Sequence, residues 1–284
     1  MVLWPSQAAA DGARDWVNVP IDVNLLFAYY THVKSDTSIS SNLPITGLVV
    51  DADIAVLRYA RTFDLFGKVG AVQVVVPYAW GRASLQGVPF GRSQDGVGDI
   101  TSIFVANIFG GPALTAKQFA QWQPEPYLTA SFWVTAPTGR YNPRSPLNIG
   151  TNRWAFKPQL SYGYWSGPGL LAVNAYVQFF TDNDEHLVTR TLKQDPLWHL
   201  EAHYSYSFTP KFWAAASLFY DHGAGTTIHG VDQNNWQSTL SLGASASYSF
   251  TPATSLSLSY SAAVAKRDIT PAKQTIQLTL QQLF

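Results

Sequence analysis

The chain has 284 residues and a formal net charge of zero, and only 13% of its residues are charged, about half the usual share for a globular domain. Without a basic excess, nothing in the composition points to a nucleic-acid partner. The chain has no cysteine, which excludes disulfides, thiolate metal sites and cysteine nucleophiles.

The first residues, MVLWPSQAAADGA, contain an alanine-rich stretch like a cleavage site. They lack the basic and apolar regions of a complete signal peptide, so we interpret them as a trimmed start. No run of apolar residues reaches the ~18 that a membrane-spanning helix requires.

Strict alternation of apolar and polar residues recurs through the rest of the chain and predicts β-strands. In Thr254–Val264, leucine and tyrosine occupy one face while serines occupy the other. Such segments are longer than the five or six residues that are about average for soluble strands, and suit the ~9–11 needed to cross a membrane. The predicted strands span residues 20–32, 52–63, 68–80, 97–109, 125–137, 151–164, 169–181, 196–209, 211–221, 235–250, 254–266 and 272–284.

The connections alternate between short turns, such as FDLFGK and YWSGPG, and long loops, such as TGRYNPRSPLN and TDNDEHLVTRTLKQ. Short turns on one side and long loops on the other are typical of bacterial outer-membrane barrels. Residues 110–125 are long where a short turn is due. Their segment ALTAKQFAQW predicts a short helix on the periplasmic side.

These patterns predict an all-β fold, a transmembrane antiparallel β-barrel of about 12 strands in a bacterial outer membrane. The barrel would span residues 17–284, after a periplasmic tail of residues 1–16 that can fold into its mouth. A soluble β-sandwich or lipocalin-like barrel is the alternative, with the apolar faces turned inward. Periodicity alone does not distinguish the two, but strand length and loop asymmetry favour the membrane.

The chain ends in the alternating strand AKQTIQLTLQQLF, whose last residue is Phe284. An aromatic residue there suits the membrane interface, and we predict the same anchoring role for Phe208 and Phe250. The expected partners are outer-membrane lipid, lipopolysaccharide and, through the C-terminal strand, the barrel assembly machinery. We expect no cofactor and no metal site.

Three segments, VLRYARTFDLFGKVGAVQVVVPYAWG, VTAPTGRYNPRSPLNIGTNRWAFKPQLSY and FFTDNDEHLVTRTLKQDP, resemble the outer-membrane transporter family named after the MetA pathway of phenol degradation. The resemblance runs from about residue 13 to the C-terminus. It implies a β-barrel that helps small aromatic or apolar compounds cross the outer membrane, and it carries over no catalytic residue.

If the apolar parity of each strand faces lipid, the other parity lines the lumen. Its aromatic residues would offer stacking surfaces for a phenol-like substrate, and its charged residues would tune selectivity. Space-filling by the aromatics and a structural ion-pair network are open alternatives. The predicted lumen residues are Tyr30, Arg58, Asp99, Tyr127, Trp133, Arg153, Lys157, Tyr176, Phe180, His199, Glu201, His203, Trp213 and Phe219.

Two motifs suggest metal binding. The histidines of HLEAH, residues 199–203, would lie ~13 Å apart on a strand, too far to share an ion with bonds of ~2.1 Å. The acidic loop TDNDEH, residues 181–186, could bind calcium or bridge to lipopolysaccharide, or be an ordinary solvated loop.

Two other function classes compete with transport. A barrel hydrolase would need a serine beside a histidine. Ser205, Ser217 and His203 could meet across neighbouring strands, although no nucleophile elbow is present. A structural or adhesin-like barrel would instead use its long loops to contact a surface.

Overall fold

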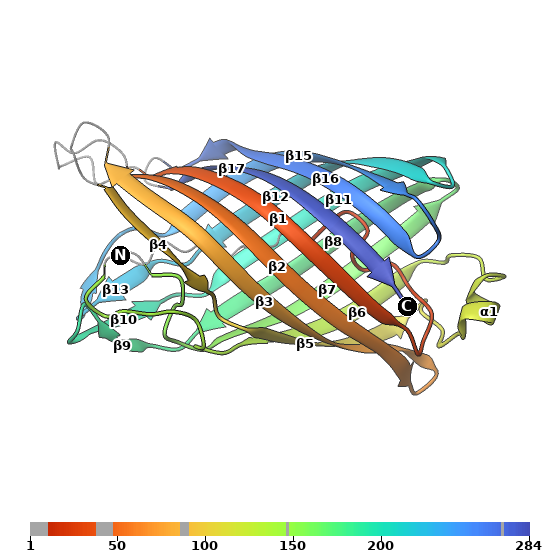
Figure 1. The fold of residues 1–284 in the computed structure, drawn as a ribbon, viewed down its shortest axis with the longest axis horizontal. Helices are drawn as coiled ribbons and strands as arrows, with labels where there is room; N and C mark the ends of the chain where they lie inside the picture. Colours follow the sequence, from red (N-terminus) through yellow and green to blue (C-terminus); the bar gives the residue numbers. More distant parts are fainter. Residues whose placement is uncertain (1–10, 38–47, 86–90, 146–147, 268–269) are drawn as a thin grey trace.

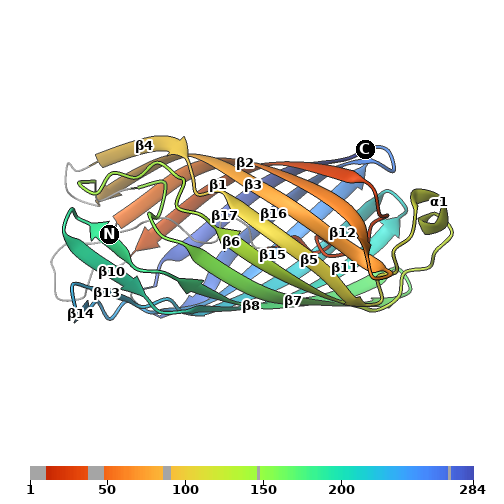
Figure 2. The same cartoon turned by 90° about the horizontal axis from the view of Figure 1, so that it is seen from below.

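The computed structural model of the protein describes residues 11–37, 48–85, 91–145, 148–267 and 270–284. They form a closed antiparallel barrel whose strands run obliquely around a long axis (Figures 1 and 2). The barrel strands are β1 (Asn24–Thr37), β2 (Leu48–Leu65), β3 (Lys68–Leu85), β4 (Gly91–Val97), β5 (Thr101–Phe109), β6 (Tyr127–Thr135), β7 (Ala155–Ser166), β8 (Gly169–Phe180), β11 (Leu197–Thr209), β12 (Phe212–Gly223), β15 (Gln237–Ser249), β16 (Thr254–Lys266) and β17 (Ala272–Leu283).

Strands β4 and β5 follow each other along the same edge of β3, so the 13 strands occupy 12 positions around the barrel. The barrel closes where β17 pairs with β1. Asn24 and Phe284 exchange backbone hydrogen bonds of 2.8 and 2.9 Å at that seam. The predicted all-β barrel of about 12 strands is therefore confirmed.

The short turns and the chain's C-terminus lie at one end of the barrel (Figure 1). In the two-residue turn between β2 and β3, Phe66 and Gly67 both have positive φ, as a type I′ hairpin requires. The predicted short helix is also at this turn end, as α1 (Ala116–Phe119). Thr115 and Gln118 form a capping box that starts it. None of the helices in the described part of the chain is long and apolar enough to cross a membrane.

The long connections lie at the opposite end, where two of them build a separate small sheet. Its strands are β9 (Asn183–His186), β10 (Arg190–Gln194), β13 (Thr226–Ile228) and β14 (Val231–Asp232), in the order β14-β13-β10-β9. The sequence pattern predicted only loops there, because strands of two to five residues carry too little alternation to be recognised.

The outer surface of the barrel is apolar. Leu57, Leu258 and Leu278 are 42 to 56% exposed, and they occupy the parity predicted to face lipid. Neighbouring strands pair all the way round the closed sheet, which is how a β-structure hydrogen-bonds its backbone in a hydrocarbon layer. The barrel is accordingly a bacterial outer-membrane protein. In such barrels the short turns lie on the periplasmic side, and that orientation remains a prediction here.

The interior is packed rather than hollow along much of its wall. One buried apolar cluster contains Ala71, Ile103, Val105 and Tyr127 on β3, β5 and β6, together with Trp16 from the segment before β1. This wall therefore packs against the chain's own N-terminal residues.

Candidate functional site: an occupied lumen

Residues 11–23 precede β1 and are called the lumen segment below. They enter the barrel from the turn end, where the Thr62 hydroxyl donates a hydrogen bond to the carbonyl of Pro20 at 2.8 Å. In Figures 1 and 2 the segment is the red coil inside the strands. Asp11 and Trp16 are buried among residues of the wall. We predicted a tail of residues 1–16 and a barrel of residues 17–284. That boundary remains a prediction, and residues 1–10 lie outside the described residues.

Arg14 fastens the lumen segment to the wall. Its Nε and one terminal nitrogen donate hydrogen bonds of 2.9 Å to the hydroxyls of Ser205 and Ser207 on β11. The guanidinium also lies 5.4 Å from the ring centre of Trp165 and 5.0 Å from that of Trp213, close enough for cation–π attraction. One side chain thus joins the segment to three strands.

Trp16 makes the second attachment. Its ring meets Trp133 edge-on at a centroid distance of 6.3 Å, and its Nε1–H donates to the Asp11 carboxylate at 2.7 Å. Lys157 places its ammonium 3.4 Å from the ring centre of Trp133 and 4.4 Å from that of Tyr176. The aromatic surfaces predicted to receive substrate are thus in contact with Trp16 and Lys157.

Arg58 is buried against the same region. Its Nε donates to the Gln73 side chain at 2.6 Å, and a terminal nitrogen lies 3.8 Å from the Asp15 carboxylate. Arg58 is thus paired with an acidic residue of the lumen segment, and not with a charge on a neighbouring strand.

A buried network of ionisable groups continues along β11. His199 contacts Asp221 through Nδ1 at 2.6 Å and Glu201 through Nε2 at 3.1 Å. Glu201 also accepts a hydrogen bond from Asn174 at 2.6 Å and lies 3.5 Å from Nε2 of His203. Both histidines of HLEAH therefore converge on one carboxylate between them. Asp221 was not among the predicted lumen residues. The alternation could have indicated it, because Asp221 lies two residues after Phe219 and therefore on the same, inward face of the strand.

Most of the predicted lumen residues do face the interior, although their role in transport remains a prediction. Inward-facing are Arg58, Tyr127, Trp133, Arg153, Lys157, Tyr176, Phe180, His199, Glu201, His203, Trp213 and Phe219. The predicted interface anchors lie on the outer surface, with Phe208 61%, Phe250 53% and Phe284 64% exposed.

The prediction that Tyr30 faces the lumen was wrong. Its ring is 51% exposed on the outer face, and its hydroxyl donates to Asp53 at 2.7 Å. The buried residues of β1 are instead Leu25, Thr31 and Val33, which have the opposite parity. The error arose because the sequence LLFAYY is apolar or aromatic at every position, so both parities look alike.

Asp99 also differs from its prediction, since it lies in the gap between β4 and β5 rather than on a lumen-facing strand position. Its carboxylate accepts hydrogen bonds from the backbone N–H groups of Gly139 and Thr151, both at 2.8 Å, and from the Thr151 hydroxyl at 2.7 Å. Asp99 thus holds the loop between β6 and β7 against the wall.

The loop end contributes a second polar group. The Arg153 guanidinium lies 4.6 Å from the ring centre of Phe180 and donates to the Gln194 side chain.

In the small sheet of β9, β10, β13 and β14, burial lowers the pKa of His186 to about 4. That histidine is therefore neutral at physiological pH.

We call the inner faces of β6, β7, β8, β11 and β12 the clamped wall, because the lumen segment is attached there. The inner faces of β15, β16 and β17 are the hydroxyl wall, since they present mostly serine, threonine and glutamine. A cavity of about 100 Å³ lies between this wall and residues 11–13. Ser241, Ser245, Ser259 and Thr275 line it, so the open space beside the lumen segment is polar.

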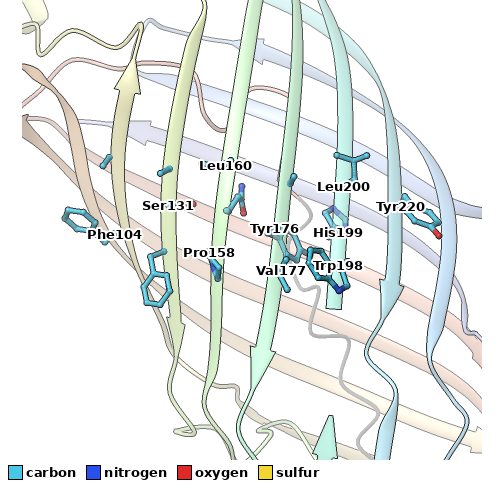
Figure 3. Close-up of a pocket in the computed structure, with 15 residues that line it drawn as sticks. Phe104, Ser131, Pro158, Leu160, Tyr176, Val177, Trp198, His199, Leu200 and Tyr220 are labelled. Atoms are coloured by element: carbon cyan, nitrogen blue, oxygen red, sulfur yellow. The ribbon is translucent and has the colours of Figure 1, made fainter. Parts of the chain in front are cut away.

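A larger apolar groove of about 700 Å³ lies over β5 to β12, with several lining side chains on the outer face (Figure 3). Phe104, Leu160 and Trp198 are among its exposed residues. Pro158 lies at its centre. Because proline has no backbone N–H to donate, the β7–β8 ladder is interrupted at Lys157 and Pro158. The groove faces the hydrocarbon layer and would be filled by lipid or by an apolar solute.

The serine and histidine named for a hydrolase do meet. Nδ1 of His203 lies 2.8 Å from the Ser217 hydroxyl, and Nε2 faces Glu201. Ser205 instead accepts the hydrogen bond from Arg14. The sequence could suggest this pair because His203 and Ser217 are direct register partners on adjacent strands.

The chain was compared with family models, with curated proteins and with solved structures. A family model described as MetA-pathway of phenol degradation matches residues 33–279. The comparison with curated proteins found no match.

Solved structures share the fold. An outer membrane channel from Pseudomonas putida F1 has 22% sequence identity and a TM-score of 0.83, over 97% of this chain and 100% of that chain. The translocator domain of the autotransporter NalP from Neisseria meningitidis has 8% identity and a TM-score of 0.58, over 95% and 91%. The β domain of the Bordetella autotransporter BrkA has 12% identity and a TM-score of 0.61, over 93% and 100%.

Proposed function

The chain belongs to the family described as MetA-pathway of phenol degradation, and from that premise we propose that it is an outer-membrane channel for small apolar or aromatic compounds, closed at rest by its own lumen segment. The observation that carries this proposal is the attachment of Arg14 and Trp16 to tryptophan rings of the clamped wall.

The chemistry of the clamped wall supports this substrate class. Trp133, Tyr176 and Trp213 offer flat apolar surfaces, while Lys157 and Gln159 supply hydrogen-bond donors among them. A phenol-like molecule needs both, a ring face for stacking and a few polar groups to orient it. Trp16 and Arg14 occupy these surfaces with an aromatic ring and a planar cation, so a flat solute could replace them.

Closure follows from where the lumen segment lies. About twelve strands enclose a narrow lumen that a peptide segment can fill, and the cavity left beside the segment measures only about 100 Å³. A phenol-sized solute would therefore require the lumen segment to move. Because its attachments are hydrogen bonds and ring contacts rather than covalent links, such movement needs only a few kcal/mol.

Uptake into liposomes tests the proposal. The purified barrel is reconstituted, and entry of a phenol-like acid is compared with entry of a sugar of similar mass, each against protein-free liposomes. The double variant Arg14→Ala with Trp16→Ala should admit the aromatic faster than the unmodified chain does. The variant Ser257→Ala, on the hydroxyl wall, is the matched control and should behave like the unmodified chain.

The outcomes separate the alternatives. Faster entry of the aromatic compound than of the sugar supports a selective channel. Equal acceleration of both solutes would indicate a general porin, and no acceleration in the double variant would contradict closure by the lumen segment.

A second candidate function rests on a specific contact, the Ser217 hydroxyl 2.8 Å from His203 with Glu201 on the other side of that ring. This order of groups is the one a serine hydrolase uses to activate its nucleophile. Labelling of the folded barrel by a fluorophosphonate probe tests it. Labelling that disappears in Ser217→Ala but persists in Ser205→Ala would support a hydrolase, and an unlabelled barrel would argue against one.

A further inference from the structure

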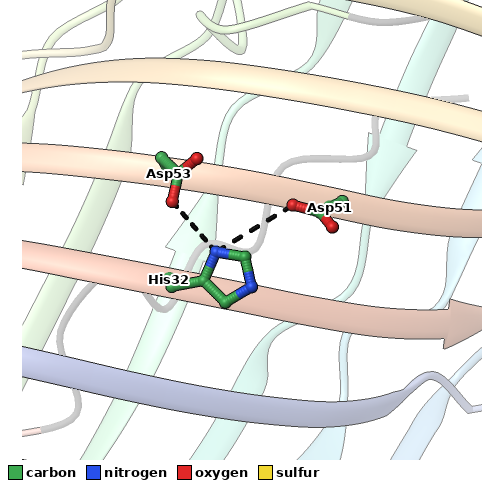
Figure 4. Close-up of side chains that lie close together, drawn as sticks. All are labelled: His32, Asp51 and Asp53. Atoms are coloured by element: carbon green, nitrogen blue, oxygen red, sulfur yellow. Dashed lines mark hydrogen bonds and ion pairs between the residues drawn. The ribbon is translucent and has the colours of Figure 1, made fainter.

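Three metal-ligating side chains meet on the outer face of the barrel, away from the lumen (Figure 4). His32 lies on β1, and its register partner on β2 is Asp53. Asp51 lies two residues before Asp53 and so shares the same face. One ligand atom from each residue lies within 4.8 Å of the other two.

Ordinary hydrogen bonding accounts for only part of this cluster. Nδ1 of His32 is 2.9 Å from Asp53 and 3.9 Å from Asp51, and one ring nitrogen can serve only one carboxylate at hydrogen-bond distance. Asp53 also accepts the Tyr30 hydroxyl at 2.7 Å. Within the described residues the Asp51 carboxylate accepts no hydrogen bond and has only the longer contact with His32.

The donor set and spacing suit a particular kind of ion. One imidazole nitrogen and two carboxylate oxygens are ligands that Zn²⁺ binds with bonds of ~2.0–2.2 Å. A tetrahedral ion with such bonds separates its ligand atoms by ~3.3–3.5 Å, between the two His32 distances. We propose that His32, Asp51 and Asp53 form a binding site for a divalent transition-metal ion such as Zn²⁺.

The surroundings favour Zn²⁺ over Ca²⁺. Calcium takes six to eight oxygen ligands and depends on the number of negative charges. Here two carboxylates are available, and the register partners of Asp51 are Lys34 and Arg82, which reduce the local negative charge. An ion that binds imidazole and needs few ligands depends less on that charge.

The site is accessible and rigid. The side chains of His32, Asp51 and Asp53 are 33, 48 and 39% exposed. The charged register partners Lys34 and Arg82 indicate that this part of the outer face lies beyond the hydrocarbon layer, so an ion can enter and complete its coordination with water or an external anion. All three belong to paired strands rather than to a loop, which fixes their spacing. A bound ion would join β1 to β2 beside the seam where β1 meets β17.

Calorimetric titration of Zn²⁺ into the folded barrel tests the proposal. The protein must carry no histidine tag, since a tag binds the same ions, and it is first treated with a chelator and dialysed. The expected result is one Zn²⁺ per chain, with clearly weaker binding of Ca²⁺. Asp51→Asn and His32→Gln should each weaken Zn²⁺ binding at least ~10-fold.

The chain offers a matched control in Asp95→Asn. Asp95 accepts the Tyr78 hydroxyl at 2.7 Å on β3–β4, just as Asp53 accepts Tyr30, and it is outside the His32 cluster. This variant should bind Zn²⁺ like the unmodified chain. Absence of Zn²⁺ binding, or equal affinity in Asp51→Asn and the unmodified chain, would overturn the proposal. Heat-dependent gel mobility verifies that each variant is folded, and the visible spectrum of bound Co²⁺ gives a second readout of the same ligands.

Discussion

The clamped wall and the hydroxyl wall are both built from long antiparallel strands, yet the side chains that they turn toward the lumen differ in kind. The clamped wall buries charged groups and aromatic rings in specific contacts, such as His199 between Asp221 and Glu201. The hydroxyl wall presents short side chains such as Ser245 and Ser259 to a small cavity. The lumen segment is thus attached at the clamped wall, whereas the short side chains of the hydroxyl wall leave a small polar cavity beside it.

The largest effect is expected from a substitution that breaks the buried network of ionisable groups in the clamped wall. Glu201→Ala should lower the free energy of unfolding by ~3–5 kcal/mol, because it leaves two histidines and Asn174 buried without their shared partner. Urea unfolding followed by tryptophan fluorescence measures this. Glu201→Gln, which keeps a hydrogen-bonding side chain, should lose less. Ser259→Ala on the hydroxyl wall should stay within ~0.5 kcal/mol, and similar losses on both walls would refute the comparison.

The next effect concerns the attachment of the lumen segment. Arg14→Ala removes two hydrogen bonds from a charged donor. Such a bond contributes ~1.5–3 kcal/mol when buried, and because both are only partly buried we expect a total loss of ~1.5–3 kcal/mol. The population with the segment released should therefore rise about 10- to 100-fold. Faster liposome uptake of a phenol-like acid is the measurement. Arg14→Lys keeps the charge but not the planar fork, so its uptake should be intermediate, and unmodified-like uptake in both variants would contradict the role of Arg14.

A smaller effect is expected from filling the cavity at the hydroxyl wall. Ser245 lines it, and its Oγ is buried without a partner among the described residues. Ser245→Trp should occupy most of the space and reduce the entry of small polar solutes severalfold, while aromatic uptake by the Arg14→Ala background changes less. A stopped-flow swelling assay compares the two, with Ser245→Ala as the control. Unchanged entry of polar solutes would show that they do not pass along the hydroxyl wall.

The smallest effect sharpens the role of the ring surfaces. Trp133→Leu in the Arg14→Ala background keeps an apolar side chain but loses a stacking surface, worth ~0.5–1 kcal/mol. The ratio of aromatic to sugar uptake should fall about 2- to 5-fold. Phe208→Leu, on the outer surface, is the control and should leave the ratio unchanged. An equal fall in both solutes would indicate a change in pore width instead of selectivity.

The sequence predicts which face of a strand points inward only where polar and apolar residues alternate clearly along that strand. In β16 and β17, serine, threonine and glutamine alternate with leucine, and the inward parity is evident from the sequence. In β1, both parities are apolar or aromatic, and Tyr30 was assigned to the wrong face. Asp99 was misplaced for another reason, since alternation cannot show that a strand is interrupted between β4 and β5.

The sequence by itself determined the barrel, its strand number and its lipid-facing surface, because these depend on local period-two patterns and on connection lengths. Only the tertiary structure decided which charges pair and which rings are covered. Arg14 meets Ser205 across 191 positions of the chain, and His32 meets Asp53 through the register of two strands. Contacts of that kind depend on register and on the path of the lumen segment, which no local pattern encodes.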